Sequence, residues 1–131
     1  MNRLIPLDAS ARRILIVGKE HLANELGSGD VKVLATPMMI ALMEAAALDA
    51  VRDYLDAGWT TVGSRVDVEH LRPTPLGARV TAEAVLVRRE DRVLEFAVQA
   101  WDGMGVIGQG THRRHLIDEE KFMASLEGKT P

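Results

Sequence analysis

The chain has 131 residues, a net charge of −3 and a pI of about 5.8, which suits one domain with a core and excludes the basic surface that a nucleic-acid backbone requires. Aromatic residues make up only 4 %, which argues against a surface that stacks single-stranded bases. The sequence contains no cysteine, and this excludes disulfides, thiolate metal sites and a cysteine nucleophile. We therefore expect a single domain over residues 1–131, located in the cytoplasm, with no nucleic acid as partner.

The N-terminal part is predicted to form a strand, a short helix and a loop. The strand covers about Arg13–Val17, and the short helix covers about His21–Leu26. The segment GSGD that follows has the composition of a flexible loop.

A long apolar helix is predicted next. Thr36 followed by Pro37 is typical of a helix start, with threonine as the cap and proline in the first turn. The helix is expected to run to about Ala57, with Gly58 as its stop. Its two carboxylates argue against a membrane span, so we interpret it as the buried helix of a globular fold without a membrane partner.

Four strands with alternating apolar and polar residues are predicted after this helix. They cover Trp59–Leu71, Arg79–Arg88, Arg92–Trp101 and Val106–Ile117. DGMG is predicted to be a hairpin turn, and the residues from about 119 a polar, frayed tail. A strand, a buried helix and four consecutive antiparallel strands predict an α+β fold of the hotdog type, a meander wrapped around one helix. The open edges of such a sheet predict a homodimer.

Glu44 is the one charged residue between Pro37 and Leu48. On a helix it shares a face with apolar residues, and no lysine or arginine lies within one turn. A buried carboxylate without a partner costs several kcal/mol, so it must either become neutral or meet a cation from another element. Glu44 is thus either on an exposed, alanine-lined stripe of the helix or a base or nucleophile in a dry cleft.

His70 and Thr36 are the next candidates. His70 continues the apolar face of its strand and precedes a proline-rich loop, so it is either a structural histidine or a proton carrier near neutral pH. Helix capping explains Thr36 by itself, but the same position is the positive end of the helix dipole, where an oxyanion is stabilised.

Three other patterns carry less weight. GMGVIG matches a dinucleotide motif but lacks a βαβ unit, so we discard it. HRRH does not predict a metal site, because residues three apart on a strand face opposite sides. Several arginines are expected near strand ends, as a solvated rim or as ligands of a nucleotide phosphate. They are Arg88, Arg89, Arg113 and Arg114.

Three segments together resemble the fluoroacetyl-CoA thioesterase family of hotdog proteins. They are ATPMMIALMEAAALDAV, GSRVDVEHLRPTPLGARVTAEAVL and AWDGMGVIGQGTHRRHLID, and the similarity spans roughly residues 13–118. That family carries a threonine at the start of the central helix, a glutamate eight residues on and a histidine twenty-six residues further. Thr36, Glu44 and His70 stand at these spacings.

The resemblance implies an acyl-CoA thioester hydrolase that uses coenzyme A as part of its substrate and no other cofactor or metal. Glu44 would attack the thioester or activate water, His70 would act as acid–base, and Thr36 would orient Glu44 or the thioester. Gly63 would let the backbone approach the substrate, and Arg114 matches an arginine near the CoA-binding region. The segment before the central helix, ELGSGDVKV, lacks the aromatic lid residue of the fluoroacetate-specific member, so a broader range of acyl groups is as plausible.

Two other functions stay open from the sequence. One is a non-catalytic hotdog dimer that binds acyl-CoA or a small hydrophobic ligand. The other is a hotdog dehydratase or hydratase, although the helix start lacks an Asp-x-Asn-Pro-x-His-like motif.

Overall fold

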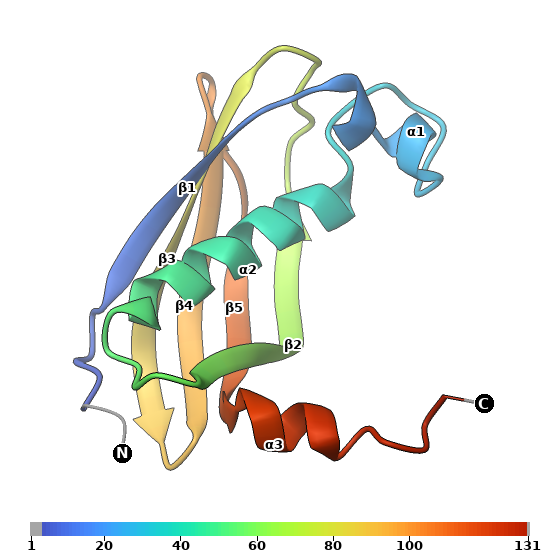
Figure 1. The fold of residues 1–131 in the computed structure, drawn as a ribbon. Coiled ribbons are helices and arrows are strands. Elements are labelled where there is room, and N and C mark those ends of the chain that lie inside the picture. Colours follow the sequence, from blue (N-terminus) through green and yellow to red (C-terminus); the bar gives the residue numbers. More distant parts are fainter. Residues whose placement is uncertain (1–3, 131) are drawn as a thin grey trace.

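A long helix lies across one face of an antiparallel sheet (Figure 1). The structure, a computed structural model, describes residues 4–130. In chain order its elements are β1 (Ser10–Ile16), the 3-10 helix η1 (Lys19–His21), α1 (Ala23–Leu26), α2 (Thr36–Arg52), β2 (Trp59–His70), β3 (Arg79–Glu90), β4 (Val93–Asp102), β5 (Gly105–Asp118) and α3 (Glu119–Ala124). The architecture is the predicted α+β hotdog fold, with α2 as the central helix.

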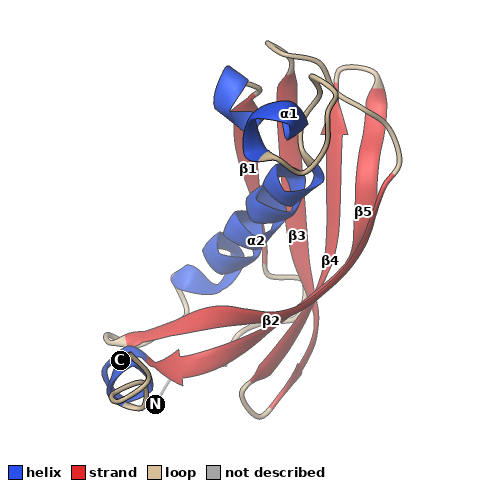
Figure 2. Cartoon of the chain, turned by 90° about the vertical axis from the view of Figure 1, so that its right-hand side faces the viewer, coloured by secondary structure: helices blue, strands red, loops and turns tan. Residues whose placement is uncertain are grey.

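The sheet has the strand order β1-β3-β4-β5-β2, and every neighbouring pair is antiparallel. The predicted meander of four strands is therefore wrong in one respect, because only β3, β4 and β5 follow one another in space. β2 pairs with β5 at the far edge, and the segment between β2 and β3 crosses the sheet. Figure 2 shows β2 and β5 curving together away from the rest of the sheet, towards α3. This pairing brings the residues of β2 beside those of the last strand.

Small residues allow α2 to lie close to the sheet. The buried side of the helix carries Met39, Met43, Ala46, Ala47, Ala50 and Val51. The facing positions of β3 and β4 include alanines that are fully buried, namely Ala82, Ala84 and Ala100. Larger side chains, among them Phe96, Leu86 and Leu94, fill the remaining space of the same core. An apolar helix of small side chains is thus the middle of the core, as the sequence predicted.

Both ends of α2 differ from the prediction. Ala35, not Thr36, is the N-cap residue, and no side chain caps this end. Thr36 is the first residue of the helix, which frees its hydroxyl for another partner. At the other end the helix stops at Arg52, ahead of the expected Ala57. Asp53 and Asp56 follow it, and carboxylates are unfavourable at the negative end of a helix dipole.

The expected hairpin turn at DGMG is present, and the C-terminal segment contains a helix that was not expected. Hairpins join β3 to β4 and β4 to β5, the second at the DGMG segment. The predicted frayed tail instead begins with α3, which Asp118 caps by accepting a hydrogen bond from the backbone N–H of Lys121 at 3.2 Å. Within residues 4–130, no helix combines the length and apolar character needed to cross a membrane.

Candidate active site

Gly63 lies on the inner side of β2 where three polar side chains converge. β2 has a bulge between Gly63 and Arg65, and Gly63 pairs with Arg114 of β5. A Cβ atom at position 63 would lie 2.7 Å from Glu44 Oε2, 3.1 Å from His112 Cε1 and 3.4 Å from Arg114 Nη1. Only a residue without a side chain leaves room for all three groups. We call the group of Glu44, Gly63, His112 and Arg114 the Gly63 niche.

Arg114 is the fixed charge of the niche. Its residue is only 6 % exposed, so of the two alternatives for this arginine the solvated rim does not apply. Alternation along β5 turns its side chain towards α2. Its Nε donates to Thr61 Oγ1 at 2.8 Å, and its Nη2 donates to the Thr61 carbonyl at 2.9 Å. Nη1 donates to His112 Nε2 at 3.2 Å and lies 3.7 Å from Glu44 Oε2. The guanidinium is thus held on three sides and presents its charge to the carboxylate.

Glu44 meets this guanidinium from α2. Its side chain is 40 % exposed, so it is neither in a fully dry cleft nor on a free surface stripe. A carboxylate in an apolar helix was expected either to become neutral or to meet a cation from another element. The structure shows the second arrangement, an ion pair with Arg114. That cation comes from β5, seventy positions along the chain. The carboxylate is therefore both oriented and accessible, as a reacting group requires.

His112 is the member of the niche that the sequence analysis did not select. Its ring is buried, and its Nδ1 lies 2.7 Å from the carbonyl oxygen of Arg65. Burial lowers the pKa of His112, and the nearby Arg114 charge acts in the same direction. The signal was present in HRRH, because strand alternation puts positions 112 and 114 on one face.

Thr36 and His70 form a second polar pair at the start of α2. Thr36 Oγ1 lies 2.7 Å from His70 Nδ1. Nε2 of the same ring is buried and has no hydrogen-bond partner among residues 4–130. Burial also lowers the pKa of His70. Both residues line a cavity of about 300 Å³, which we call the His70 pocket, and its other walls include Ala23, Val33 and Pro73.

The five predicted site residues thus divide into two groups within one chain. Glu44, Gly63 and Arg114 meet in the niche, whereas Thr36 and His70 pair at the pocket. Eight residues of helix separate Thr36 from Glu44, which is about 12 Å along the axis. The hydroxyl of Thr36 therefore bonds to His70 and not to Glu44.

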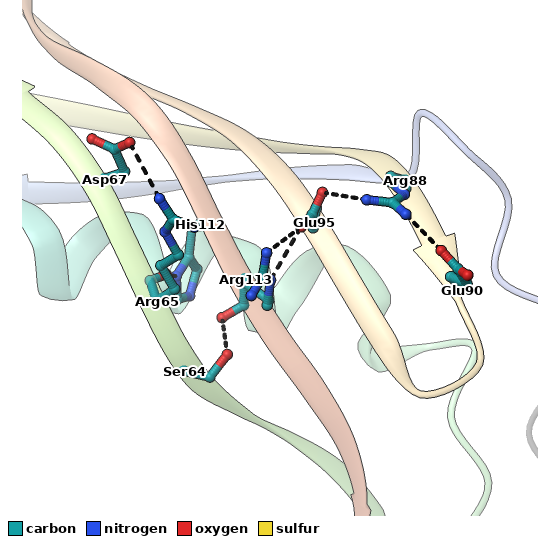
Figure 3. Close-up of polar contacts among 8 residues, drawn as sticks. All are labelled: Ser64, Arg65, Asp67, Arg88, Glu90, Glu95, His112 and Arg113. Carbon is teal, nitrogen blue, oxygen red and sulfur yellow. Dashed lines mark hydrogen bonds and ion pairs between the residues drawn. The ribbon is translucent and has the colours of Figure 1, made fainter.

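The opposite face of the sheet carries a separate network of ion pairs (Figure 3). Glu95 accepts from Arg113 at 2.9 Å and lies 3.6 Å from Arg88, which also pairs with Glu90 at 2.6 Å. Residues 112 and 114 of HRRH face α2, while Arg113 joins this outer network. In the described part of the chain, no group of three or more acidic or histidine side chains could hold a metal ion. Because carboxylates already neutralise these arginines, the niche and the pocket remain the better candidates for a site.

Comparisons with known proteins agree with this architecture. The sequence model of a family described as fluoroacetyl-CoA-specific thioesterase matches residues 17–120. A fluoroacetyl-CoA thioesterase of Streptantibioticus cattleyicolor is 43 % identical over 100 residues, which cover 76 % of this chain and 72 % of the relative. The solved structure of the fluoroacetyl-CoA thioesterase FlK is 34 % identical, with a TM-score of 0.91 over 98 % of this chain and 99 % of that one. A thioesterase-superfamily protein of Thermus thermophilus is 28 % identical, with a TM-score of 0.87 over 95 % and 92 %.

Proposed function

Because the chain belongs to the family of fluoroacetyl-CoA-specific thioesterases, we propose that it hydrolyses an acyl-CoA thioester to coenzyme A and a carboxylic acid. The observation that carries the proposal is the Gly63 niche, where an accessible carboxylate faces a buried guanidinium across a position without a side chain. Because the Glu44 side chain is 40 % exposed, a thioester carbonyl is proposed to approach the carboxylate from its solvent side. The acyl group is proposed to occupy the His70 pocket, which measures about 300 Å³.

Glu44 is the group proposed to start the reaction. A carboxylate oxygen that attacks the thioester carbonyl forms a mixed anhydride and expels the thiolate of coenzyme A, and water then cleaves the anhydride. Alternatively, the same carboxylate takes a proton from water, which attacks the carbonyl directly. Both routes benefit from an oriented carboxylate, and the ion pair with Arg114 at 3.7 Å favours one orientation.

His70 is proposed to move the protons. Its lowered pKa leaves the ring neutral at neutral pH, so in the anhydride route it can accept a proton from the water that cleaves the anhydride and release that proton to the thiolate or to solvent afterwards. If Nδ1–H donates to Thr36 Oγ1, then Nε2 carries the free lone pair for this step. Among residues 4–130 this Nε2 has no hydrogen-bond partner, although the backbone of Arg72 opposes the effect of burial on the pKa of the ring, and such an atom suits a proton carrier.

A homodimer is proposed to bring the two groups together. β2 pairs with β5 on one side only, so its other edge is open along the strand. Two β2 strands that pair antiparallel around a two-fold axis near Val66 place His70 of one protomer beside Gly63 of its partner, because these positions lie on either side of the axis. The acid–base group of one chain then reaches the carboxylate of the other. We place this dimer in the cytoplasm, since a cysteine-free chain needs no oxidising compartment.

The test is the release of free thiol from a panel of acyl-CoAs, from acetyl and fluoroacetyl to medium chains, by wild type and Glu44→Gln. We expect turnover of at least one acyl-CoA of the panel by wild type and a collapse of kcat in the variant. Glu127→Gln is the matched control, because Glu127 is an exposed glutamate of the C-terminal segment and lies outside the strand proposed to form the dimer. Acyl-CoA binding without turnover by wild type would instead identify a binding protein.

The dimeric site has its own test. Glu44→Gln and His70→Ala dimers are each expected to be inactive, but a mixed dimer has one intact site if the two residues come from different chains. After full subunit exchange, the mixture should regain about a quarter of wild-type activity. No recovery in a mixture that has exchanged subunits would contradict a site shared between protomers.

A further inference from the structure

We infer that His112 is a positioning residue of the Gly63 niche, whose neutral ring holds the Arg114 guanidinium against Glu44; the inference rests on the proposed function of that niche. The ring bonds directly to Arg114 Nη1. It joins the backbone of β2 to the guanidinium of β5, so it acts through Arg114.

The hydrogen-bond partners of His112 fix its protonation state. Nδ1 lies 2.7 Å from the carbonyl oxygen of Arg65, and a carbonyl only accepts, so Nδ1 must carry the hydrogen. Nε2 lies 3.2 Å from Arg114 Nη1, and a guanidinium only donates, so Nε2 must present its lone pair. Only the neutral Nδ1–H tautomer satisfies both contacts. The Thr36–His70 pair does not have this property, because a hydroxyl both donates and accepts.

The surroundings of the ring favour this neutral form. The charged groups that face it are Arg114 on its own strand and Glu44 on α2, and β4 contributes the uncharged ring of Phe96 at a centroid distance of 6.4 Å. Burial lowers the pKa of His112 most, the Arg65 carbonyl opposes this, and the effects of Arg114 and Glu44 have opposite signs. Protonation would remove the acceptor at Nε2 and place a second cation beside the guanidinium.

The Nη1 atom of Arg114 faces Glu44, and its position depends on the lone pair of His112 Nε2. Nε and Nη2 are held by Thr61, whereas Nη1 has His112 and the carboxylate as its neighbours. Without the lone pair of Nε2, Nη1 is restrained only by Glu44, whose side chain is itself partly exposed. The ion pair that orients the carboxylate is then weakened, and the reaction slows although both residues remain.

The first test reads the tautomer directly in the wild-type protein. The chain has four histidines, so ¹⁵N-labelled histidine gives few ring signals, and His112→Gln identifies the one that belongs to His112. In NMR spectra at neutral pH, we expect the coupling between ring nitrogen and hydrogen to show a hydrogen on Nδ1 and none on Nε2. A hydrogen on Nε2, or a charged ring, would overturn the inference.

The second test uses a pair of variants that separate the two contacts. The amide of His112→Gln reaches the place of Nε2 and can still accept from Arg114. His112→Asn ends near the place of Nδ1 and keeps only the contact with Arg65. We expect the asparagine variant to lose about 10- to 100-fold in kcat with little change in KM, as for a misplaced group, and the glutamine variant to regain most of it.

The control is His115→Gln, which alters a histidine of the same strand and should leave kcat within about twofold of wild type. Circular dichroism is used to establish that each variant is folded. Equal activities of the glutamine and asparagine variants would assign His112 a purely structural role. If wild type hydrolyses no thioester, the proposed function fails, but the tautomer still decides whether His112 is the acceptor for Arg114.

Discussion

Replacing Gly63 by alanine tests the niche most directly. The added Cβ would lie 2.7 Å from Glu44 Oε2, and an ordinary contact is about 3.4 Å, so the carboxylate must retreat by about 0.7 Å. The Cβ would also lie 3.1 Å from His112 Cε1, so by the same comparison this atom must move away by about 0.3 Å. The Glu44 side chain is 40 % exposed and can swing towards solvent, whereas the buried histidine has less freedom.

Activity should therefore fall much more than stability. A displacement of this size in a reacting group costs about 100-fold in rate. Strain at the histidine lowers the free energy of unfolding, but alanine is favoured over glycine in a strand by about 0.5–1 kcal/mol, and the two effects largely cancel. We expect the melting temperature to stay within about 5 °C of wild type.

The assay is kcat/KM for thiol release, combined with thermal unfolding of the same samples. Gly103→Ala is the matched control, because a Cβ at that turn would meet no atom within 4 Å. The reasoning is refuted if Gly63→Ala keeps kcat/KM within about twofold of the control variant. A variant that unfolds outright would mean that the histidine, and not the carboxylate, absorbs the strain.

Three further predictions concern stability. Gly110→Ala would drive a Cβ into the backbone carbonyl of Asp67, so the free energy of unfolding in urea should fall by about 3 kcal/mol, and a loss below about 1 kcal/mol would contradict the β2–β5 packing. Asp49→Asn removes the 2.6 Å pair with Arg13 that ties α2 to β1; because both groups are partly exposed, we expect a loss of only about 0.5–1 kcal/mol that shrinks in high salt, with unchanged thiol release. Burial lowers the pKa of His70 and His112, so these residues bind protons more tightly in the unfolded chain than in the folded one. Their contribution to the free energy of unfolding should therefore be constant above about pH 6.5 and should fall as the pH drops through the lowered pKa values. Urea titrations at several pH values test this, and greater stability on acidification would count against it.

The sequence was sufficient for most of the local structure. An apolar stretch with a threonine–proline start can bury itself only as a helix in the middle of a fold, and alternation after Gly58 can serve only strands. These patterns predicted α2 and the four strands to within a few residues. The exceptions are the end of α2 at Arg52 and the helix α3 in the expected tail, where weak local signals of a few residues decide the outcome.

Contacts between residues that are far apart in the sequence could not be predicted in this way. Alternation shows that β2 is a strand but does not show whether β3 or β5 lies beside it. That pairing decides the site, because β5 brings Arg114 and His112 to the bulge at Gly63. For the same reason, Thr36 was predicted to cap its own helix, whereas its hydroxyl lies beside a histidine 34 positions further on.

The sequence by itself determined which residues are chemically unusual: a lone carboxylate in an apolar helix, a histidine at a strand end and a glycine in the middle of a strand. These are local properties, because periodicity and composition can be read from neighbours along the chain. Only the tertiary structure decided what each of them meets. Hydrogen bonds and ion pairs act over a few ångströms in space, and the fold sets those distances by pairing strands whose order the sequence pattern leaves open.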